Sequence, residues 1–222
     1  KSIERQAQLL VEKMEKANKK HARTGDAQLV WGLTETNVTY ANPNREISGY
    51  GNPSFLGGQF IAEMYGIGMK YGAFTVAPWC ISETDRISSD FGYIGLPSEF
   101  YPRSSYYHTK MMAENMKGEF LKTESSNSYV KTIASISEDE ICVMILNKDQ
   151  CNDYDFDLVL NEDSNSKKAL VIRADLDLDK TISSIIPNQT TMMFVLSSSG
   201  DVLKQYTYGL THNLKYQKPE IK

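Results

Sequence analysis

A glutamate at the end of a short apolar run is the first residue whose type and position suit catalysis. The run from Gln28 to Leu33 is rich in branched and aromatic side chains, and Glu35 follows it between Thr34 and Thr36. The run is too short for a convincing helix and suits a buried strand over 28–35. Because α/β enzymes place their chemistry where parallel strands end, we expect Glu35 to be a catalytic carboxylate. The alternative is a polar exit from the strand into a loop.

A second apolar run ends in an aromatic residue. Residues 73–81 are predicted to form another buried strand, and Pro78 suits its end because proline donates no ladder hydrogen bond. Trp79 is then expected at the same rim as Glu35, where an indole ring can stack on a sugar face. A core tryptophan is the alternative. Glu83 and Asp85 follow this strand and can reach the same cleft.

The connection over residues 36–53 is long, polar and without periodicity. Such a loop is unusual in a compact domain and is more often functional. We expect Asn37 and Tyr40 to contact a ligand. Four further residues of the loop carry suitable polar groups, namely Asn42, Arg45, Tyr50 and Asn52. A merely solvated loop is the alternative for each of them.

Helices are expected before, between and after the two strands, over residues 2–23, 54–71 and 104–121. The first has apolar residues at three- and four-residue spacing and Ser2 as a candidate N-cap. Asn52 and Pro53 are expected to begin the second, because proline suits the first helical position. Alternation along 28–35 would place Leu29, Trp31 and Leu33 on the same side as Glu35. His108, in the third helix, is expected to be structural or exposed.

The composition changes near residue 124, and short alternating runs follow. Turn-rich pieces separate them, which is typical of an antiparallel β-sandwich, and no helix is expected after residue 122. The predicted strands are residues 129–137, 140–146, 154–160, 169–174, 190–196 and 202–208. Aspartates alternate along 153–157 and 175–179, which favours solvent-facing strand positions over a calcium site.

Composition limits the classes of function. The chain has 222 residues with a formal net charge of −4, so nucleic acid is an unlikely partner. No apolar run approaches the roughly 20 residues of a membrane helix. Three cysteines lack metal spacing, and we expect buried free thiols rather than a pair between Cys142 and Cys151. The chain opens at Lys1 in a helical pattern, so we expect that it was cut from a longer parent or lost an upstream segment.

Three segments carry a resemblance to clan A glycoside hydrolases. The sequence Val30-Trp-Gly-Leu-Thr-Glu-Thr-Asn37 resembles the seventh barrel strand of that clan, which ends in the nucleophilic glutamate. Residues 54–71 resemble the seventh helix of families 39, 51 and 79, and residues 73–79 resemble the eighth strand. These families end in a β-sandwich like residues 125–215, and agarase-like relatives stay open as well.

The resemblance implies an α/β plus all-β fold: a partial (β/α)8 barrel, with its last two strands and flanking helices, followed by an antiparallel β-sandwich. The implied domains are residues 1–123 for the barrel units and 124–222 for the sandwich. The implied activity is that of a retaining glycoside hydrolase acting on an oligo- or polysaccharide. Such an enzyme uses two carboxyl groups, one as nucleophile and one as acid and base.

The same resemblance assigns roles to residues and partners. Glu35 would be the nucleophile, and Asn37, Tyr40 and Trp79 would bind the sugar. The acid/base glutamate of the clan lies on the fourth barrel strand, which this chain lacks, so we expect the isolated chain to be inactive. The implied partners are a carbohydrate and the upstream barrel segment, without cofactor or metal and with an extracellular or periplasmic location. Two alternatives stay open: a non-catalytic carbohydrate-binding or structural module, and a self-contained α+β domain in which Glu35 is merely buried or paired.

Overall fold

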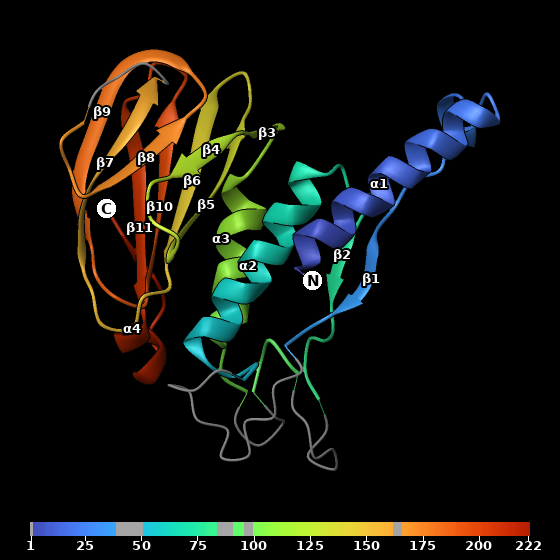
Figure 1. Cartoon of the computed structure of the whole chain (residues 1–222). Coiled ribbons are helices and arrows are strands. Elements are labelled where there is room, and N and C mark those ends of the chain that lie inside the picture. The colour runs from blue at the N-terminus through green and yellow to red at the C-terminus, as the bar shows by residue number, and fades with distance from the viewer. Residues whose placement is uncertain (1, 39–50, 84–90, 96–99, 162–165) are drawn as a thin grey trace.

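The computed structural model describes the chain except residues 1, 39–50, 84–90, 96–99 and 162–165. Two short parallel strands and three helices form one side of the molecule, and a two-sheet β-sandwich forms the other (Figure 1). The combination of α/β units with a following sandwich is the fold class predicted from the sequence. Among the described helices, none combines the length and apolar character needed to cross a membrane.

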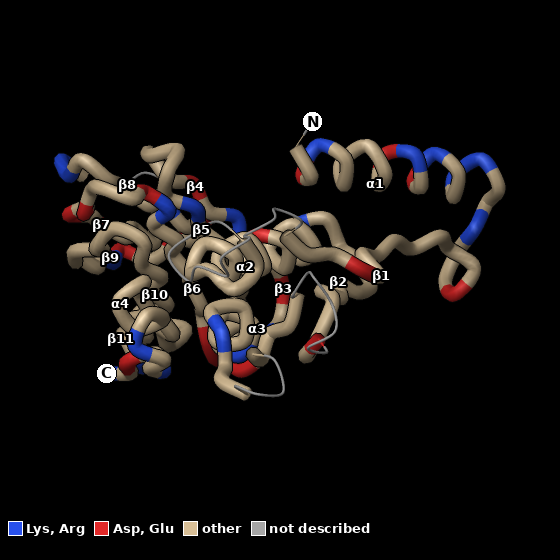
Figure 2. Tube along the Cα trace, turned by 90° about the horizontal axis from the view of Figure 1, so that it is seen from below, with Lys and Arg blue, Asp and Glu red and all other residues tan. Residues whose placement is uncertain are grey.

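The first helix, α1 (Ile3–Lys20), is amphipathic as predicted, with Ser2 as its N-cap. The Ser2 hydroxyl accepts a hydrogen bond from the Arg5 backbone N–H at 3.3 Å. Only Ala7 of this helix is buried, and Figure 2 shows α1 lying beyond β1 and β2, away from the sandwich. An ion pair of 2.7 Å between Glu4 and Lys70 ties its beginning to α2. α1 is therefore attached mainly through its N-terminal end.

Two parallel strands, β1 (Leu33–Thr36) and β2 (Val76–Pro78), form a small sheet of their own. Both are shorter than the runs predicted from the sequence. Backbone hydrogen bonds continue the contact before the strands begin: the Leu33 N–H donates to the Thr75 carbonyl at 2.9 Å, and the Phe74 N–H donates to the Trp31 carbonyl at 2.7 Å. Among the described residues, β1 pairs only with β2.

Helix α2 (Phe55–Lys70) connects the two strands, and α3 (Ser104–Asn115) follows them. The cap of α2 is Ser54, whose hydroxyl accepts from the Gly57 N–H at 2.9 Å, so the prediction of Asn52 as cap was wrong by two positions. Helix α3 ends before the predicted residue 121. Gly118 has φ +75°, and a Cβ there would meet the Ile136 carbonyl oxygen at 2.1 Å, so the chain turns and its next residues join a sheet.

The sandwich contains a six-stranded and a four-stranded sheet. The first has the order β12 (Glu220–Ile221), β11 (Val202–Gly209), β10 (Thr190–Ser197), β6 (Glu140–Asn147), β5 (Val130–Ile136) and β3 (Glu119–Leu121). The second has the order β4 (Thr123–Ser125), β8 (Leu170–Ala174), β7 (Tyr154–Asn161) and β9 (Asp177–Ile186). Its strands are antiparallel except for the parallel pair β7–β8. The predicted boundary at residues 123 and 124 falls within β4 and stays a prediction.

All six predicted strands of this half are present, while β3, β4, β9 and β12 were missed. A short helix, α4 (Leu210–Leu214), follows β11, so the expectation of no helix after residue 122 was wrong. The three cysteines are free thiols, as expected, but only Cys142 is buried, so the expectation of buried thiols was wrong for Cys80 and Cys151. Asp177 and Asp179 lie exposed on β9, and no three His, Cys, Asp or Glu side chains of the described residues gather as a metal site.

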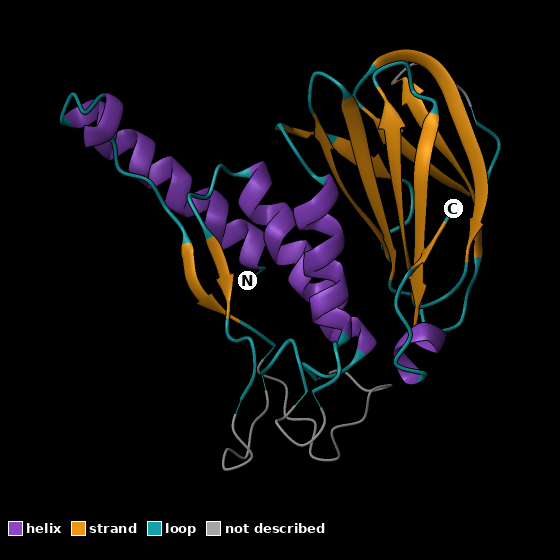
Figure 3. Ribbon diagram, turned by 180° about the vertical axis from the view of Figure 1, so that it is seen from behind, coloured by secondary structure: helices purple, strands orange, loops and turns teal. Residues whose placement is uncertain are grey.

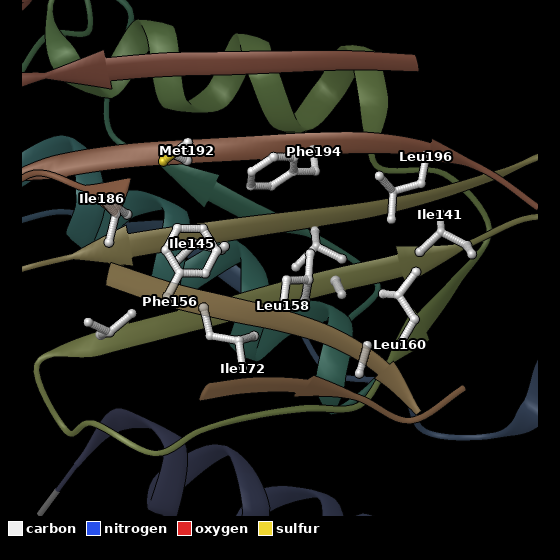
Figure 4. Close-up of a cluster of buried hydrophobic side chains, with 14 of the residues drawn as sticks. Ile141, Ile145, Phe156, Leu158, Leu160, Ile172, Ile186, Met192, Phe194 and Leu196 are labelled. Carbon is white, nitrogen blue, oxygen red and sulfur yellow. The ribbon is translucent and has the colours of Figure 1, made fainter. Parts of the chain in front are cut away.

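Apolar side chains from both sheets fill the space between them (Figure 4). A second apolar layer joins the outer face of the six-stranded sheet to α2 and α3, and Figure 3 shows the two helices standing between the sheet and the β1–β2 pair. This layer includes Phe55, Ala62, Met111, Met112, Ile133, Met144, Met193, Val195 and Tyr208. Gly66 allows α2 to approach closely, since a Cβ there would meet the Ile133 side chain at 2.8 Å.

Some of the polar groups buried in the same layer form hydrogen bonds with one another. The Gln59 amide donates to Thr191 Oγ1 at 3.2 Å and to the Asn147 carbonyl at 3.2 Å. His108 is fully buried, with Nε2 2.7 Å from Thr191 Oγ1 and Nδ1 2.8 Å from the Ser104 carbonyl oxygen. His108 is therefore structural, which was one of the two expected outcomes. Burial lowers its pKa to about 4, so the imidazole is neutral at pH 7.

Candidate functional site

The carboxyl ends of β1 and β2 lie side by side and form the rim of the candidate site. Thr36 is paired with Pro78, and the Trp79 N–H donates to the Thr36 carbonyl at 2.9 Å. Glu35 therefore lies one residue before this paired position and Trp79 one residue after it. Both strands run toward the same end of the molecule (Figure 1). This arrangement agrees with the rim predicted for the two residues.

A register shift places Glu35 on the open side of β1. The chain advances three positions from Leu33 to Thr36 while its partner advances only two, from Val76 to Pro78. Thr34 and Glu35 are both exposed, whereas Leu33 and Thr36 are partly covered. An extra residue in one strand breaks the alternation of side chains and re-aims them. The carboxylate of Glu35 is therefore open to solvent beside the β2 end.

The predicted sharing of one face by Glu35, Leu33, Trp31 and Leu29 was wrong. Trp31 is only 6% exposed, and its indole N–H donates to the Tyr71 carbonyl at 2.7 Å, at the end of α2. Leu33 is partly covered while Glu35 is exposed, because the register shift lies between them. Trp31 thus anchors β1 to α2 and stays away from the rim.

Trp79 has half of its surface exposed, and its orientation is fixed by a hydrogen bond. Its relative exposure is 50%, and Nε1 donates to Glu83 Oε1 at 2.9 Å. Glu83 itself is nearly buried. An indole ring that is held by a carboxylate and open on its surface can receive a flat apolar ligand face. Glu83 thus acts on Trp79 rather than standing free at the rim.

Asn37 links the two strand ends. Its amide nitrogen donates to the Trp79 carbonyl and, at 2.9 Å, to the Phe91 carbonyl, and its Oδ1 accepts from the Val38 N–H at 2.6 Å. These contacts occupy the amide with backbone groups, and its predicted contact with a sugar stays a prediction. Tyr40 lies outside the described residues, as do Asn42, Arg45, Tyr50 and Asp85.

The segment from Phe91 to Ile94 supports the rim and was not recognised in the sequence. The Gly92 carbonyl accepts from the Asn52 amide at 3.1 Å and from Arg103 Nη1 at 3.0 Å. A Cβ on Gly92 would meet the Ile94 carbonyl oxygen at 2.6 Å, so only glycine fits this close packing. Among the described residues, Asn37, Asn52 and Arg103 therefore converge on one backbone segment.

A partly buried tyrosine pair joins this segment to α2. The Tyr93 and Tyr65 hydroxyl oxygens are 3.2 Å apart, which joins the loop to α2. Burial raises the pKa of Tyr93 well above its ordinary value, so the phenol is protonated at neutral pH. A neutral phenol in this position donates or accepts hydrogen bonds and does not act as a base.

Comparisons with known proteins give a likeness in fold and no family. No protein-family model matches the chain, and no curated protein matches its sequence. Among solved structures, the chain is similar to an alpha-L-arabinofuranosidase from Thermotoga maritima, with a TM-score of 0.52 and 10% identity over 85% of this chain and 46% of that one.

Two xylanase structures were also found. A GH30 endoxylanase from Clostridium papyrosolvens C71 has a TM-score of 0.49 and 10% identity over 75% of this chain and 42% of that one. A glycoside hydrolase family 30 subfamily 8 xylanase from Clostridium acetobutylicum has a TM-score of 0.46 and 11% identity over 74% and 41% of the two chains. The chain spans less than half the length of each of these proteins. Its fold is similar to part of a glycoside hydrolase.

Proposed function

We propose that this chain is the C-terminal part of a retaining glycoside hydrolase, in which Glu35 is the nucleophile. The observation that carries the proposal is the exposed carboxylate of Glu35 at the carboxyl end of β1, beside the half-exposed Trp79 that follows β2. A carboxylate and an aromatic platform at one rim are two of the groups that a sugar-cleaving site needs, the third being a second carboxyl group. The fold likeness to an arabinofuranosidase supports the same class of substrate.

The chemistry follows from this geometry. The Glu35 carboxylate attacks the anomeric carbon of the sugar while a second carboxyl group protonates the departing glycosidic oxygen. The resulting glycosyl ester is then hydrolysed by a water molecule that the second group deprotonates. In a retaining enzyme the two carboxyl groups lie about 5 Å apart. Trp79 is proposed to stack on the sugar and to hold the anomeric carbon within reach of Glu35.

The second carboxyl group is proposed to come from an upstream barrel segment of the same protein. Among the described residues, β1 is paired on one edge only, by β2. Apolar side chains are exposed near both strands: Val30 is 68% exposed, Phe74 80% and Ile81 70%. A two-stranded sheet is marginal by itself, and further strands beside β1 would cover part of this surface. Glu83 is not assigned this role, because it is nearly buried and bonded to Trp79.

The proposal is tested with the full-length protein that contains this chain. We expect Glu35→Gln to lower kcat for aryl xylosides or aryl arabinofuranosides by at least about a thousandfold, because the amide cannot form the ester intermediate. Glu15→Gln, which changes an exposed carboxylate on α1, is the matched control and should retain full activity. Unchanged turnover in a folded Glu35→Gln variant would contradict the proposal.

The isolated chain gives a second test. We expect the purified 222-residue chain to hydrolyse none of these substrates at a rate above the uncatalysed background, because the acid/base group lies elsewhere. Robust turnover by this chain alone would refute the assignment of that group to an upstream segment, and would make the loops after β1 and β2 the place to look for it.

A further inference from the structure

Two tyrosines from different halves of the molecule pack against each other. Tyr101 lies just before α3, and Tyr216 follows α4 at the end of the sandwich. Their ring centroids are 4.4 Å apart, with 63° between the ring planes. Tyr216 is 53% exposed, and Phe100, next to Tyr101 in the chain, is 64% exposed. We call Phe100, Tyr101 and Tyr216 the junction aromatics.

The backbone holds the junction aromatics in place. The Tyr101 carbonyl accepts from the Gly95 N–H at 2.8 Å, and the Arg103 guanidinium carbon lies 5.8 Å from the centre of the Tyr101 ring. The Tyr216 N–H donates to the Asn213 carbonyl at 3.1 Å. Tyr101 and Tyr216 are therefore fixed before any ligand arrives, which lowers the entropic cost of binding.

Their backbone conformations are unusual for aromatic residues. Phe100 has φ +43° and Tyr216 has φ +54°, in the left-handed region that glycine occupies most readily. Both side chains are more than half exposed, so burial in a core does not account for a large side chain at either position. Tyr216 directly follows Lys215, the C-cap of α4, where a left-handed conformation commonly ends a helix. The conformation fixes the backbone that carries each exposed ring.

A hollow lies beside the residues that follow Tyr216 in the chain. This open surface pocket of about 730 Å³ is lined by His212 and residues 217–222. The side chains of Gln217, Lys218 and Glu220 offer donors and acceptors there. The Gln217 N–H donates to the His212 carbonyl at 2.9 Å, which fixes the turn between ring and cavity. Exposed rings beside polar side chains suit a ligand that has apolar faces and a hydroxylated edge.

The junction aromatics lie at the same end of the molecule as the Glu35 rim. Figures 1 and 3 show α4 at the end toward which β1 and β2 run, with α2 and α3 between. Tyr101 lies on the segment that leads from the β2 end into α3, at residues 91–103. A chain-like ligand held at the Glu35 rim could therefore extend across this end of the molecule to Tyr216.

We propose that the junction aromatics and the cavity beside Tyr216 form a second carbohydrate-binding site, which holds a distant part of an oligo- or polysaccharide chain. The inference rests on the proposed function and deepens it, because it assigns a second contact with the saccharide chain outside the Glu35 rim. A sugar ring stacks its C–H face on an aromatic ring and turns its hydroxyl groups toward neighbouring polar side chains. The site binds and does not cleave.

The test is an NMR titration of this chain with xylohexaose and with cellohexaose. We expect at least one of them to shift backbone signals of residues 100–103 and 212–218. The informative variant is Tyr216→Gly, because glycine removes the ring and accepts φ +54° without strain. It should raise Kd about tenfold while leaving the melting temperature unchanged or higher. Tyr216→Phe should keep the affinity, and Tyr129→Ala, an exposed tyrosine on the sandwich, should do the same.

Several outcomes would overturn the site. One is the absence of shifts at residues 100–103 and 212–218 with both hexasaccharides. Another is an unchanged Kd in Tyr216→Gly. If that variant also had a lower melting temperature, the Tyr216 ring would serve only to pack the two halves of the molecule together. A concentration-dependent dimer that Tyr216→Gly abolishes would make the surface an interface between copies of the chain. None of these results bears on Glu35, whose role is tested by turnover and labelling in the full-length protein.

Discussion

In the sandwich, Phe156, Leu158 and Phe194 face one another between two sheets and are 0%, 0% and 1% exposed, whereas Val30 and Phe74, beside β1 and β2, are 68% and 80% exposed. Both regions are built from apolar strands, but only in the sandwich does a second sheet cover the apolar side chains. The β1–β2 pair is covered by α2 on one side and carries Glu35 on the other. The sandwich and its helices thus supply stability, while the rim keeps exposed the groups proposed to act on a sugar.

The largest effect is expected from the sandwich core. Phe194→Ala should lower the free energy of unfolding by about 3–5 kcal/mol, because it removes a buried ring that packs on Phe156 with centroids 6.4 Å apart. Phe74→Ala is the matched control and should change it by less than about 0.5 kcal/mol, since that ring is exposed. Urea unfolding monitored by circular dichroism measures both. Equal losses in the two variants would mean that the β1–β2 side is as tightly packed as the core.

The stability of the layer between the helices and the sandwich should depend on pH, because His108 is buried in that layer. Its folded pKa of about 4 lies below the ordinary 6.5, so the unfolded chain binds the proton more readily. Stability should therefore be complete above pH 6.5 and fall as the pH drops toward 4, with a total loss of about 3 kcal/mol from this group. Unfolding free energies of the protein and of His108→Gln, measured from pH 7 to 4, give the difference.

The control for this pH dependence is His21→Gln, which removes an exposed histidine after α1. It should leave the pH profile of the parent protein intact. If His108→Gln kept the same slope between pH 6.5 and 4, the acid sensitivity would have to come from carboxylates elsewhere, and the buried histidine would carry no part of it.

The smallest effect is expected at the rim, where the Glu83–Trp79 hydrogen bond orients a half-exposed ring. Glu83→Leu should cost about 1 kcal/mol or less, since water can replace the lost partner of the indole N–H. It should nevertheless move the indole N–H signal of Trp79 in NMR spectra and leave that of buried Trp31 in place. Glu83→Gln keeps an acceptor oxygen and should shift the signal less. A stationary Trp79 signal in both variants would show that Glu83 does not orient the ring.

The strands of the sandwich could be read from the sequence where apolar residues alternate or run together, as along β6 and β10. β9 was not predicted, because the apolar residues of its more buried face are separated by polar residues in the sequence. These apolar residues are Leu178, Ile182 and Ile186. The end of α3 was misplaced because apolar residues continue beyond Gly118, and the turn there depends on packing against Ile136. The spacing of apolar residues indicates which side chains are buried, but it does not indicate which element a strand or turn packs against.

At the candidate site, the sequence was enough to predict that Glu35 and Trp79 lie at one rim, because each residue lies at the end of a predicted strand. The register shift in β1 could not be predicted, because it depends on pairing with a strand some forty residues away in the chain. The contacts of Asn37, Asn52 and Arg103 with the backbone of residues 91–92 also join residues that are separated in the chain. A polar residue in a loop has the same appearance in sequence whether it binds a ligand or supports the backbone.

The most direct test of the central proposal is covalent labelling of the full-length protein with 2-deoxy-2-fluoro glycosides, followed by peptide mass spectrometry. The fluorosugar slows hydrolysis of the ester intermediate, so the nucleophile keeps the sugar. We expect one sugar attached to the peptide that contains Glu35, and no label in Glu35→Gln. A label on any other carboxylate, in a protein that turns over the parent glycoside, would contradict it.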